Sequence, residues 1–330
     1  MKKIVLVLFI LLFPLKVIAL SANSAILMDM KTNRVLYKKN IHSIKSVASI
    51  SKIMTALIAI ESGKLDDEVI IGDEIDNSYG SGIYIKKGER IKLIDLVYGL
   101  MLRSGNDAAL AISNYISDDF VNLMNLKADS IGMINTTFNN PSGLDEEDGN
   151  FSTAYDMALL MSYAYKNKIF RKIISTKKYK LKTNMNTYIW YNKNKLLSTY
   201  KYCTGGKTGY TKKAKRTLIN TASNNLDLVV VTLNDPNDWK DHKTLFEYGF
   251  NNFKYYKILN KKKFITKDKY YKKLYIKNNY YYPIKDSEKN NIKIIYKIKK
   301  IRFNYHNKKV GTANIYFNDT LIHKESIYAK

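Results

Sequence analysis

Cysteine and histidine are scarce in this sequence of 330 residues, which contains one cysteine and four histidines. A single cysteine cannot form an internal disulfide, so the hydrophobic core alone must stabilise the fold. These residues are scattered along the chain: Cys203, His42, His242, His306 and His323. We therefore expect no metal site and no cofactor. No motif supports a Ser-His-Asp triad either, which leaves lysine as the base for any serine nucleophile.

Long apolar runs are also lacking, except at the N-terminus. Lys2 and Lys3 precede an apolar run at 4–15, and residues 17–19 offer a small-residue cleavage site. This layout is typical of a secretory signal peptide, and the run is too short for a comfortable membrane span. We expect residues 1–19 to be a signal peptide cleaved after Ala19 or Ala22, with an uncleaved anchor as the alternative. The protein is then exported and works outside the cytoplasm.

Acidic residues are few, because 55 Lys and Arg stand against 29 Asp and Glu, for a net charge of +26. Residues 251–330 hold 21 of these cations and only 5 acidic residues. In a cytoplasmic protein, tyrosines interleaved with lysines would suggest nucleic acid, but export removes that reading, so we expect no nucleic-acid partner. An anionic wall polymer or a membrane surface fits an exported basic module better, and a solvated surface without a partner fits equally well.

The most informative stretch is 47–60. From Ile53 onward it is apolar on nearly every side, which predicts a helix buried in the core. If this helix begins near Ser49, then Ser49 and Lys52 share one face, and the lysine amine can reach the serine hydroxyl. That pairing is typical of an activated nucleophile. Amides at the start of the helix can also stabilise negative charge on an attacked carbonyl.

The Ser-x-x-Lys spacing alone is weak, because a lysine-rich chain produces it by accident. It occurs three times, as Ser49/Lys52, Ser175/Lys178 and Ser198/Lys201. The second and third copies lie in polar surroundings with no buried helix behind them, which predicts solvated surface. For the first copy the plain alternative is an N-cap serine followed by a surface lysine.

Two further segments carry polar groups at points where the chain turns. Residues 93–103 predict a helix that stops at Ser104-Gly105-Asn106, and a second helix starts near Asp107 with Asn106 or Asp107 as its cap. Residues 205–211 place glycines around Lys207 and Thr208, an arrangement that lets a backbone approach a carboxylate ligand closely. Capping and a glycine-rich hairpin entry explain these two segments equally well without function.

The rest of the chain predicts a mixed α and β protein. We expect strands at 25–30, 34–38, 216–223 and 226–233, and helices at 120–131, 152–165 and 240–248. Residues 139–144 read as a loop followed by the acidic run 145–148, and 166–200 cannot be assigned. Near the C-terminus, alternating apolar residues predict strands at 292–303 and 313–317.

Taken together, Ser49-x-x-Lys52, Ser104-x-Asn106 and Lys207-Thr208-Gly209 resemble the penicillin-interacting serine enzymes. More closely, the chain resembles the low-molecular-mass D-alanyl-D-alanine carboxypeptidases of bacterial cell walls, through most of residues 24–250. The stretches that carry this closer likeness are Ala48-Ser49-Ile50-Ser51-Lys52-Ile53-Met54-Thr55, Leu102-Arg103-Ser104-Gly105-Asn106-Asp107-Ala108-Ala109, Asn140-Pro141-Ser142-Gly143-Leu144, Ser152-Thr153-Ala154-Tyr155-Asp156 and Gly206-Lys207-Thr208-Gly209-Tyr210-Thr211.

This resemblance implies a fold of the α+β class, like that of β-lactamases and transpeptidases. An antiparallel sheet of five strands flanked by helices, with a helical subdomain, would form the catalytic domain at 24–250. A small basic β-rich domain would follow at 255–330. Relatives commonly end in an amphipathic membrane-binding helix, which this sequence lacks, so attachment would come from an uncleaved signal or from basic charge, or the protein would be released.

The resemblance also implies roles. Ser49 would form an acyl-enzyme with peptidoglycan stem peptides or, as covalent inhibitors, with β-lactams, and Lys52 would be its general base. Burial and the neighbouring cation Lys207 would keep Lys52 neutral. Ser104 would relay a proton to the leaving amine. The substrate-binding residues would be Asn106 for an amide, Lys207, Thr208 and Gly209 for the terminal carboxylate, and Tyr210, whose backbone amide would complete the oxyanion hole with that of Ser49.

Three alternatives to carboxypeptidase action stay open. A D,D-endopeptidase acting on peptidoglycan crosslinks would use the same catalytic groups, and only the shape of the cleft separates the two. A β-lactamase is disfavoured because the acidic run at 145–148 lacks the usual Glu-x-x-Leu-Asn setting. A non-catalytic wall-binding protein is disfavoured because the chain keeps all three motifs.

Overall fold

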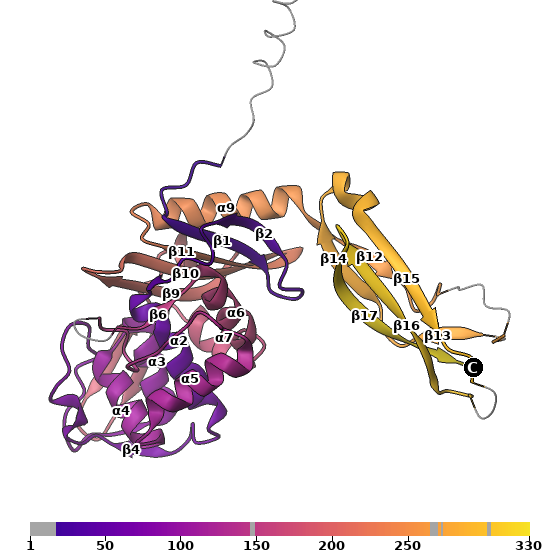
Figure 1. Ribbon diagram of the computed structural model, residues 1–330. Coiled ribbons are helices and arrows are strands. Elements are labelled where there is room, and N and C mark those ends of the chain that lie inside the picture. The colour runs from indigo at the N-terminus through magenta and orange to yellow at the C-terminus, as the bar shows by residue number, and fades with distance from the viewer. Residues whose placement is uncertain (1–17, 146–148, 265–269, 272, 302–304) are drawn as a thin grey trace, which may run out of the picture.

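A five-stranded antiparallel sheet organises the first part of the structure (Figure 1). The computed structural model describes residues 18–145, 149–264, 270–271, 273–301 and 305–330. The strand order is β2-β1-β11-β10-β9, so the sheet joins the start of this unit to its end. The five strands are β1 (Ser24–Asp29), β2 (Val35–Lys39), β9 (Cys203–Thr211), β10 (Lys215–Asn224) and β11 (Leu226–Leu233). This arrangement confirms the predicted fold class.

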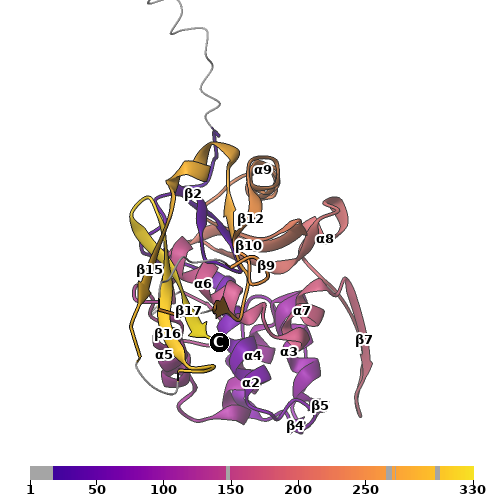
Figure 2. The ribbon, with the colours of Figure 1, turned by 90° about the vertical axis from the view of Figure 1, so that its right-hand side faces the viewer.

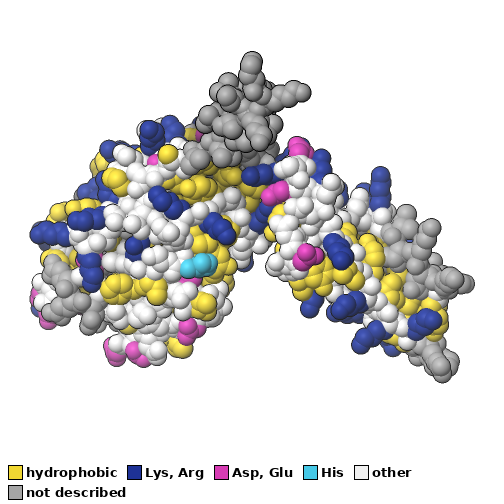
Figure 3. Space-filling model, turned by 45° about the horizontal axis from the view of Figure 1, so that its top comes forward, with side chains coloured by type: hydrophobic (Ala, Val, Ile, Leu, Met, Phe, Trp, Pro, Cys, Tyr) yellow, Lys and Arg dark blue, Asp and Glu magenta, His cyan; other side chains and the backbone are white. Residues whose placement is uncertain are grey.

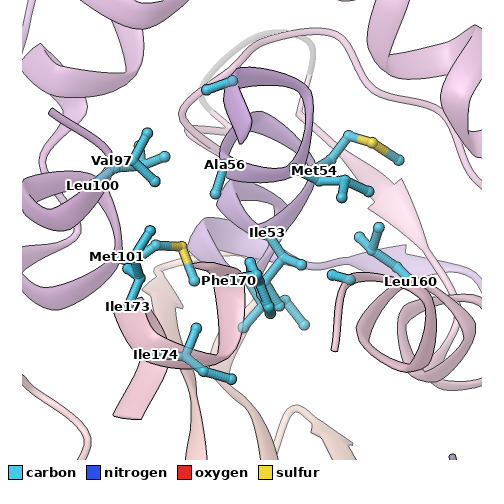
Figure 4. Close-up of a cluster of buried hydrophobic side chains, with 14 of the residues drawn as sticks. Ile53, Met54, Ala56, Val97, Leu100, Met101, Leu160, Phe170, Ile173 and Ile174 are labelled. Carbon is cyan, nitrogen blue, oxygen red and sulfur yellow. The ribbon is translucent and has the colours of Figure 1, made fainter. Parts of the chain in front are cut away.

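Helices cover both faces of the sheet. Helix α9 (Asp238–Asn252) lies on one face, where Leu245 and Phe246 pack against Leu228 and Val230 of β11. The short α8 (Leu196–Thr199) lies on the same face, where Leu196 belongs to the α9 core. Most of the other helices form a larger layer on the opposite face, packed around α2 (Lys52–Glu61) as Figure 4 shows. Because β11 is buried on both faces, its sequence is almost continuously apolar rather than alternating.

The helical layer comes from the middle of the chain. Its helices are α3 (Leu93–Arg103), α4 (Asn106–Ile116), α5 (Phe120–Ile131), α6 (Ala154–Ala164) and α7 (Lys168–Ser175), with the short turns η1 (Ala48–Ser51) and η2 (Asp73–Ile75). Three small strand pairs accompany them: β3 (Lys45–Ser46) with β6 (Phe151–Ser152), β4 (Glu68–Ile70) with β5 (Arg90–Lys92), and β7 (Lys178–Lys182) with β8 (Thr187–Tyr191).

Several predicted elements agree with the structure and others need correction. The helices predicted at 93–103 and 120–131 have these same bounds. The helix predicted from Ser49 instead starts at Lys52, after the separate turn η1. Residues 205–211, for which the plain interpretation was a glycine-rich hairpin entry, are part of strand β9, because pairing with β10 outweighs the low strand preference of glycine. The unassigned stretch 166–200 holds α7, β7, β8 and α8.

The C-terminal unit is built from strands (Figure 2). The four-stranded sheet β13-β17-β16-β15 packs against the pair β12-β14 over a core that includes Ile276, Ile315 and Ile327. The elements are β12 (Lys254–Leu259), β13 (Leu274–Ile276), β14 (Tyr280–Ile284), η3 (Asp286–Asn291), β15 (Ile292–Ile298), β16 (Lys309–Phe317) and β17 (Thr320–Ala329). The strand predicted at 292–303 ends at Ile298, and part of its predicted end, 302–304, lies outside the described residues.

Arg34 joins the two units. Its side chain is 8% exposed and donates two hydrogen bonds of 2.9 Å to the carboxylate of Glu288 in η3. The guanidinium also lies over aromatic rings, 4.3 Å from the ring centre of Phe317 and 5.1 Å from that of Tyr282. A buried guanidinium held by a carboxylate and by ring faces fixes the C-terminal unit against the hairpin of β1 and β2.

We predict that Arg34→Ala destabilises the protein by about 3 kcal/mol, because it leaves Glu288 without its buried partner. Denaturant unfolding measures this, and limited proteolysis should detect faster cleavage between the units. The control is Arg90→Ala, since Arg90 pairs with Glu68 at 3.6 Å while both side chains are 58% exposed, and its loss should cost under about 0.5 kcal/mol. Equal stability of the two variants would contradict the inferred role of Arg34.

Candidate active site

Ser49 lies on the turn η1 at the entrance to helix α2. Ala48, just before it, has a positive φ of 50°, so the chain makes a sharp turn that presents the serine. Lys52 Nζ donates to Ser49 Oγ over 3.2 Å and to the side-chain oxygen of Asn106 over 2.7 Å. A third hydrogen bond goes to the backbone oxygen of Ser142. The lysine amine is thus held beside the hydroxyl by two fixed acceptors.

Lys52 is fully buried, and this changes its chemistry. Burial, which disfavours the charged amine, and the positive charge of Lys193 together lower the pKa of Lys52 to about 7, and burial is the larger cause. A lysine with this pKa is in large part neutral at neutral pH and can accept a proton from Ser49. The family resemblance implied that Lys207 is the neighbouring cation that lowers the pKa of Lys52. In the structure this effect comes from Lys193.

Lys207 is buried as well, at 1% exposed. Its burial, together with the charges of Lys52 and Lys193, holds the pKa of Lys207 well below its usual range. A neutral Lys207 exerts little repulsion on Lys52, which explains why Lys193 takes that role. The Lys207 amine donates to Ser104 Oγ over 2.9 Å and to its neighbour's carbonyl oxygen over 2.6 Å.

The loop at 139–144 packs against the start of α2, next to the turn η1 that carries Ser49. Thr55 Oγ1 in α2 donates to the carbonyl oxygen of Pro141 over 2.7 Å. The side-chain oxygen of Asn140 accepts from the backbone N–H groups of Ser142 and Gly143, which closes the loop on itself. This geometry aims the Ser142 carbonyl at Lys52.

Gly143 is essential to this packing because it has φ +79° and no side chain. A Cβ at this position would lie 2.3 Å from the carbonyl oxygen of Ala48 and 2.5 Å from Ser51 Oγ. We predict that Gly143→Ala destabilises the protein by about 3 kcal/mol and lowers activity by displacing η1. Gly132→Ala is the matched control, since Gly132 has φ +88° but nothing within 4 Å, so only a backbone cost of about 1 kcal/mol is expected. Thermal unfolding of both variants distinguishes crowding from backbone strain.

Ser104 and Asn106 form the opposite wall of the site. Ser104 ends α3 in the left-handed conformation with φ 65°, which turns its hydroxyl toward Lys207. Asn106 or Asp107 was expected to cap the next helix, but Gly105 is at the N-cap and no side chain caps α4. The Asn106 amide instead joins Lys52 to the carbonyl oxygen of Tyr79, to which its Nδ2 donates over 2.6 Å. Because the Asn106 side chain is used in these two hydrogen bonds, it does not cap α4.

Strand β9 forms the third wall, and it is the last strand of the sheet. Side chains alternate along a strand, so Lys207 and Gly209 face the helical layer while Thr208 and Tyr210 face the α9 side. Lys207 lies opposite Ile219, a member of the core around α2, which agrees with this assignment. A Cβ at Gly209 would lie 3.1 Å from the Ser49 N–H nitrogen, so the glycine allows η1 to approach the strand.

These walls enclose a cleft of about 340 Å³. Of the sequence-predicted residues, Ser49, Ser104, Thr208, Gly209 and Tyr210 line it directly, whereas Lys52, Asn106 and Lys207 lie behind its surface. The other lining residues are Ser81, Lys193, Lys195, Arg216, Asp238 and Trp239. The sequence analysis missed all six.

Arg216 stands out among the missed residues. It lies opposite Tyr210 in the register of β9 and β10, and directly opposed residues share one face, so it lies above the sheet on the α9 side. Asp238 fixes the guanidinium through hydrogen bonds of 3.0 and 2.9 Å. The Arg216 side chain is 43% exposed, so the side of the guanidinium that faces away from Asp238 is open to the cleft. A planar, always charged group in this position suits a carboxylate ligand.

Asp145 and the two further Ser-x-x-Lys pairs do not line this cleft. Asp145 accepts from Ser46 Oγ over 2.8 Å and from Thr211 Oγ1 over 2.5 Å, so it ties the loop to β9. The remainder of the acidic run, 146–148, lies outside the described residues. In the part of the chain that the structure describes, no cluster of three or more His, Cys, Asp or Glu is arranged to hold a metal ion. The Ser175/Lys178 and Ser198/Lys201 pairs are exposed.

The fold and the site are those of the active-site serine enzymes that use a lysine as base. The family described as D-alanyl-D-alanine carboxypeptidase, peptidase S11, matches residues 14–237. The chain therefore belongs to this family.

Individual relatives agree. D-alanyl-D-alanine carboxypeptidase DacF of Bacillus subtilis is 37% identical over 214 residues, which are 62% of this chain and 55% of DacF, little more than half of that relative's length. The D-alanyl-D-alanine carboxypeptidase of Streptomyces sp. strain K15 is 31% identical over 68% of this chain and 85% of its own length. Penicillin binding protein 5 from Haemophilus influenzae superposes with a TM-score of 0.80 at 25% identity, over 96% of this chain and 98% of that one.

Proposed function

We propose that this protein is a serine-type D-alanyl-D-alanine carboxypeptidase that removes the terminal D-alanine from peptidoglycan stem peptides. The observation that carries the proposal is the buried amine of Lys52, 3.2 Å from Ser49 Oγ and with a pKa lowered to about 7. A buried lysine of this kind serves as a general base. Ser49 opens on a cleft that ends at Thr208 and Arg216, which suit a carboxylate. Family membership supports the same substrate class.

Acylation would begin with attack of Ser49 Oγ on the carbonyl carbon between the two D-alanines, while Lys52 Nζ takes the serine proton. The backbone N–H groups of Ser49 and Tyr210 would stabilise the oxyanion, since β9 passes close to η1. The Ser104 hydroxyl, which accepts a hydrogen bond from Lys207 Nζ, would give its proton to the leaving amine and take one in return from Lys52, so that Lys52 is neutral again before hydrolysis. The carbon–nitrogen bond breaks, D-alanine leaves and a serine ester remains.

Hydrolysis of the ester would complete the cycle. Water attacks the acyl carbon, Lys52 again accepts the proton, and Ser49 Oγ recovers its hydrogen, so one water is consumed for each peptide bond cleaved. Asn106 would contribute by holding Lys52 over 2.7 Å and by binding a substrate amide. β-Lactams would acylate Ser49 by the same attack and act as covalent inhibitors.

Binding of the terminal carboxylate of the stem peptide would give the enzyme its preference for the end of a peptide. Thr208 and Gly209 shape this end of the cleft, and Arg216 supplies the charge. Lys207 contributes from behind through Ser104 rather than by direct contact, because its side chain faces the helical layer.

Export is the proposed localisation. The predicted signal peptide spans residues 1–19, and residues 1–17 lie outside the described part of the chain. Ser21 Oγ donates to Asp235 over 2.6 Å, and Ala22 is fully buried, so cleavage after Ala19 keeps contacts that cleavage after Ala22 would remove. None of the helices in the described ranges is long and apolar enough to cross a membrane.

Lysines are spread over the C-terminal unit (Figure 3), which supports an anionic wall polymer or membrane surface as its partner.

A mass-spectrometric time course with a pentapeptide ending in D-Ala-D-Ala tests the function. The expected result is loss of one alanine from the peptide. The matched control is the same peptide with a C-terminal amide, which lacks the carboxylate and should react at least about 100-fold more slowly. An intact pentapeptide, with the protein shown to be folded by circular dichroism, would refute the proposed activity.

A further inference from the structure

The segment just before β1 lies against the start of α9 (Figure 1). The backbone N–H groups of Ser21 and Ala22 donate to Asp241 Oδ2 over 2.7 and 3.2 Å. Ser21 Oγ lies 2.6 Å from Asp235 Oδ1 and 3.0 Å from Asp241 Oδ2, so its single proton serves one of these oxygens at a time. Two carboxylates from the far end of the catalytic unit therefore converge on this segment.

Both carboxylates are buried, and no cation of the described residues is paired with them. Asp235 is fully buried and Asp241 is 4% exposed. Across the described ranges neither forms an ion pair with a lysine, arginine or histidine, and Asp235 Oδ2 has no hydrogen-bond partner. Burial and the charge of Asp241 raise the pKa of Asp235. Two buried carboxylates are costly unless a positive charge accompanies them.

Leu20 is anchored beside this pair. Its side chain is 9% exposed and belongs to the core that includes Leu245 and Phe246 of α9. Its carbonyl oxygen accepts a hydrogen bond of 3.0 Å from Lys39 Nζ. Ala19, in contrast, is exposed, so the boundary between exposed and buried chain coincides with the predicted cleavage after Ala19. Cleavage at this bond would leave an N-terminus that is already held in place.

The new N-terminus would lie within reach of the carboxylates. Successive backbone nitrogens are at most about 3.7 Å apart and the Ser21 nitrogen is 2.7 Å from Asp241 Oδ2, so the Leu20 nitrogen lies within about 6.5 Å of that oxygen. Opposite charges at this range stabilise each other. Hydrolysis of the Ala19–Leu20 bond consumes one water, leaves a carboxylate on the signal peptide and converts the neutral Leu20 amide to an α-ammonium group.

We propose that Asp235 and Asp241 bind the α-ammonium group of a mature N-terminus at Leu20, so that removal of the signal peptide completes an ion pair at the start of α9. The inference uses the proposed cleavage after Ala19, and it is independent of the proposed reaction at Ser49. The precursor and the processed chain then differ at this point in charge.

This ion pair lies close to the carboxylate end of the cleft. Asp235 Oδ1 accepts from the N–H of Asn237 over 3.1 Å, which fixes the turn that leads into α9. The Asp235 N–H donates to the carbonyl oxygen of Arg216 over 3.0 Å. Asp238, which follows Asn237, holds the Arg216 guanidinium. A cation at Asp235 and Asp241 therefore positions Arg216 through this turn.

The other charged groups around Leu20 come from β2 and α9. Lys39 lies at the Leu20 carbonyl oxygen and opposes the ammonium charge. Tyr37 is neutral, because burial and the charge of Asp241 raise its pKa. His242 is neutral too, because burial lowers its pKa to about 3. The two carboxylates dominate, so the pKa of the Leu20 α-amine should lie at least about one unit above the ordinary range of about 7.7–8.0.

Competitive labelling of amines at several pH values, read by mass spectrometry of the N-terminal peptide, measures this pKa. The chain 20–330 with a free Leu20 amine is compared with the same chain extended by Gly-Ser, which keeps the charge but moves it two residues away. Asp241→Asn removes one carboxylate from each chain. Asp129→Asn, at an exposed position on α5, is the control for charge.

We expect a pKa of about 9 or above for the chain that starts at Leu20, and of about 8 for the extended chain and for Asp241→Asn. Asp129→Asn should leave the pKa unchanged. The extension should also raise KM for a D-Ala-D-Ala peptide at least about threefold while changing kcat less than about twofold, and Asp241→Asn should abolish this difference between the two chains.

An ordinary pKa in the chain that starts at Leu20, or equal values in the two chains, would overturn the site. N-terminal sequencing of the protein secreted from its full-length precursor should give Leu20, and any other first residue would also overturn the inference. A raised pKa with an unchanged KM would overturn the link to Arg216. A raised pKa without turnover of the peptide would leave the ion pair intact and refute the proposed function alone.

Discussion

Ser49→Ala is expected to abolish turnover of a D-Ala-D-Ala peptide, with a loss of about 10⁵-fold or more, because no ester can form without the hydroxyl. The fold should be unchanged, since Ser49 Oγ makes only the contact with Lys52 and a long one of 3.5 Å to the Ser142 carbonyl oxygen. Release of D-alanine measures the loss. Mass spectrometry of the intact protein after incubation with a penicillin gives a second readout, since only the wild type should gain the mass of the inhibitor.

Ser198→Ala is the matched control for this prediction. Ser198 and Lys201 repeat the spacing of Ser49 and Lys52, but both are exposed. The variant should keep full activity and should still be labelled by the penicillin. Labelling of Ser49→Ala, or loss of labelling in Ser198→Ala, would show that the nucleophile has been assigned to the wrong serine.

Lys52→Met is expected to lower the acylation rate by about 10⁴-fold, because it removes the amine that is hydrogen-bonded to Ser49 Oγ. In the wild type, activity should fall about tenfold for each pH unit below about 7, as Lys52 gains a proton. Lys193→Met should move this limb to higher pH, since a charge that lowers the Lys52 pKa is gone. The exposed Lys201→Met should leave it in place. A wild-type profile flat from pH 5 to 8 would exclude Lys52 as the base.

The same pKa makes a prediction about stability. The pKa of Lys52 falls from 10.5 to about 7 on folding, so between these values the unfolded chain binds more protons than the folded one. The unfolding free energy therefore rises with pH across this window, and Lys52 is most destabilising below about pH 7. The full effect is on the order of 5 kcal/mol. Denaturant unfolding at pH 7 and pH 10 should show a smaller gain for Lys52→Met than for the wild type.

Local sequence was a good guide where side-chain type alone determines structure. The spacing of apolar residues predicted α3 and α5, and the run of β-branched residues predicted β11. It failed where tertiary pairing decides. The glycines at 205–209 were interpreted as the entry to a hairpin, yet they form a strand, because β10 supplies the hydrogen bonds and a side chain at Gly209 would crowd η1.

Lys193 and Arg216 show a second limit. In a chain with 55 Lys and Arg, one more cation carries no signal in the sequence. Their importance comes from distant segments that meet at one cleft: Lys193 from the stretch before α8, and Arg216 from β10. Asn106 shows the converse, because its motif was recognisable although neither Asn106 nor Asp107 caps α4 as predicted.

The position of β9 at the end of the sheet has a consequence for solubility. An unpaired strand edge that stays open for a substrate also stays open to the edge of another copy of the chain, which favours aggregation. The sequence of β9 counters this risk, because three of its nine residues are glycines, Gly205, Gly206 and Gly209, which have a low preference for strands. Residues that serve the reaction would thus also keep the protein from assembling through its own active site.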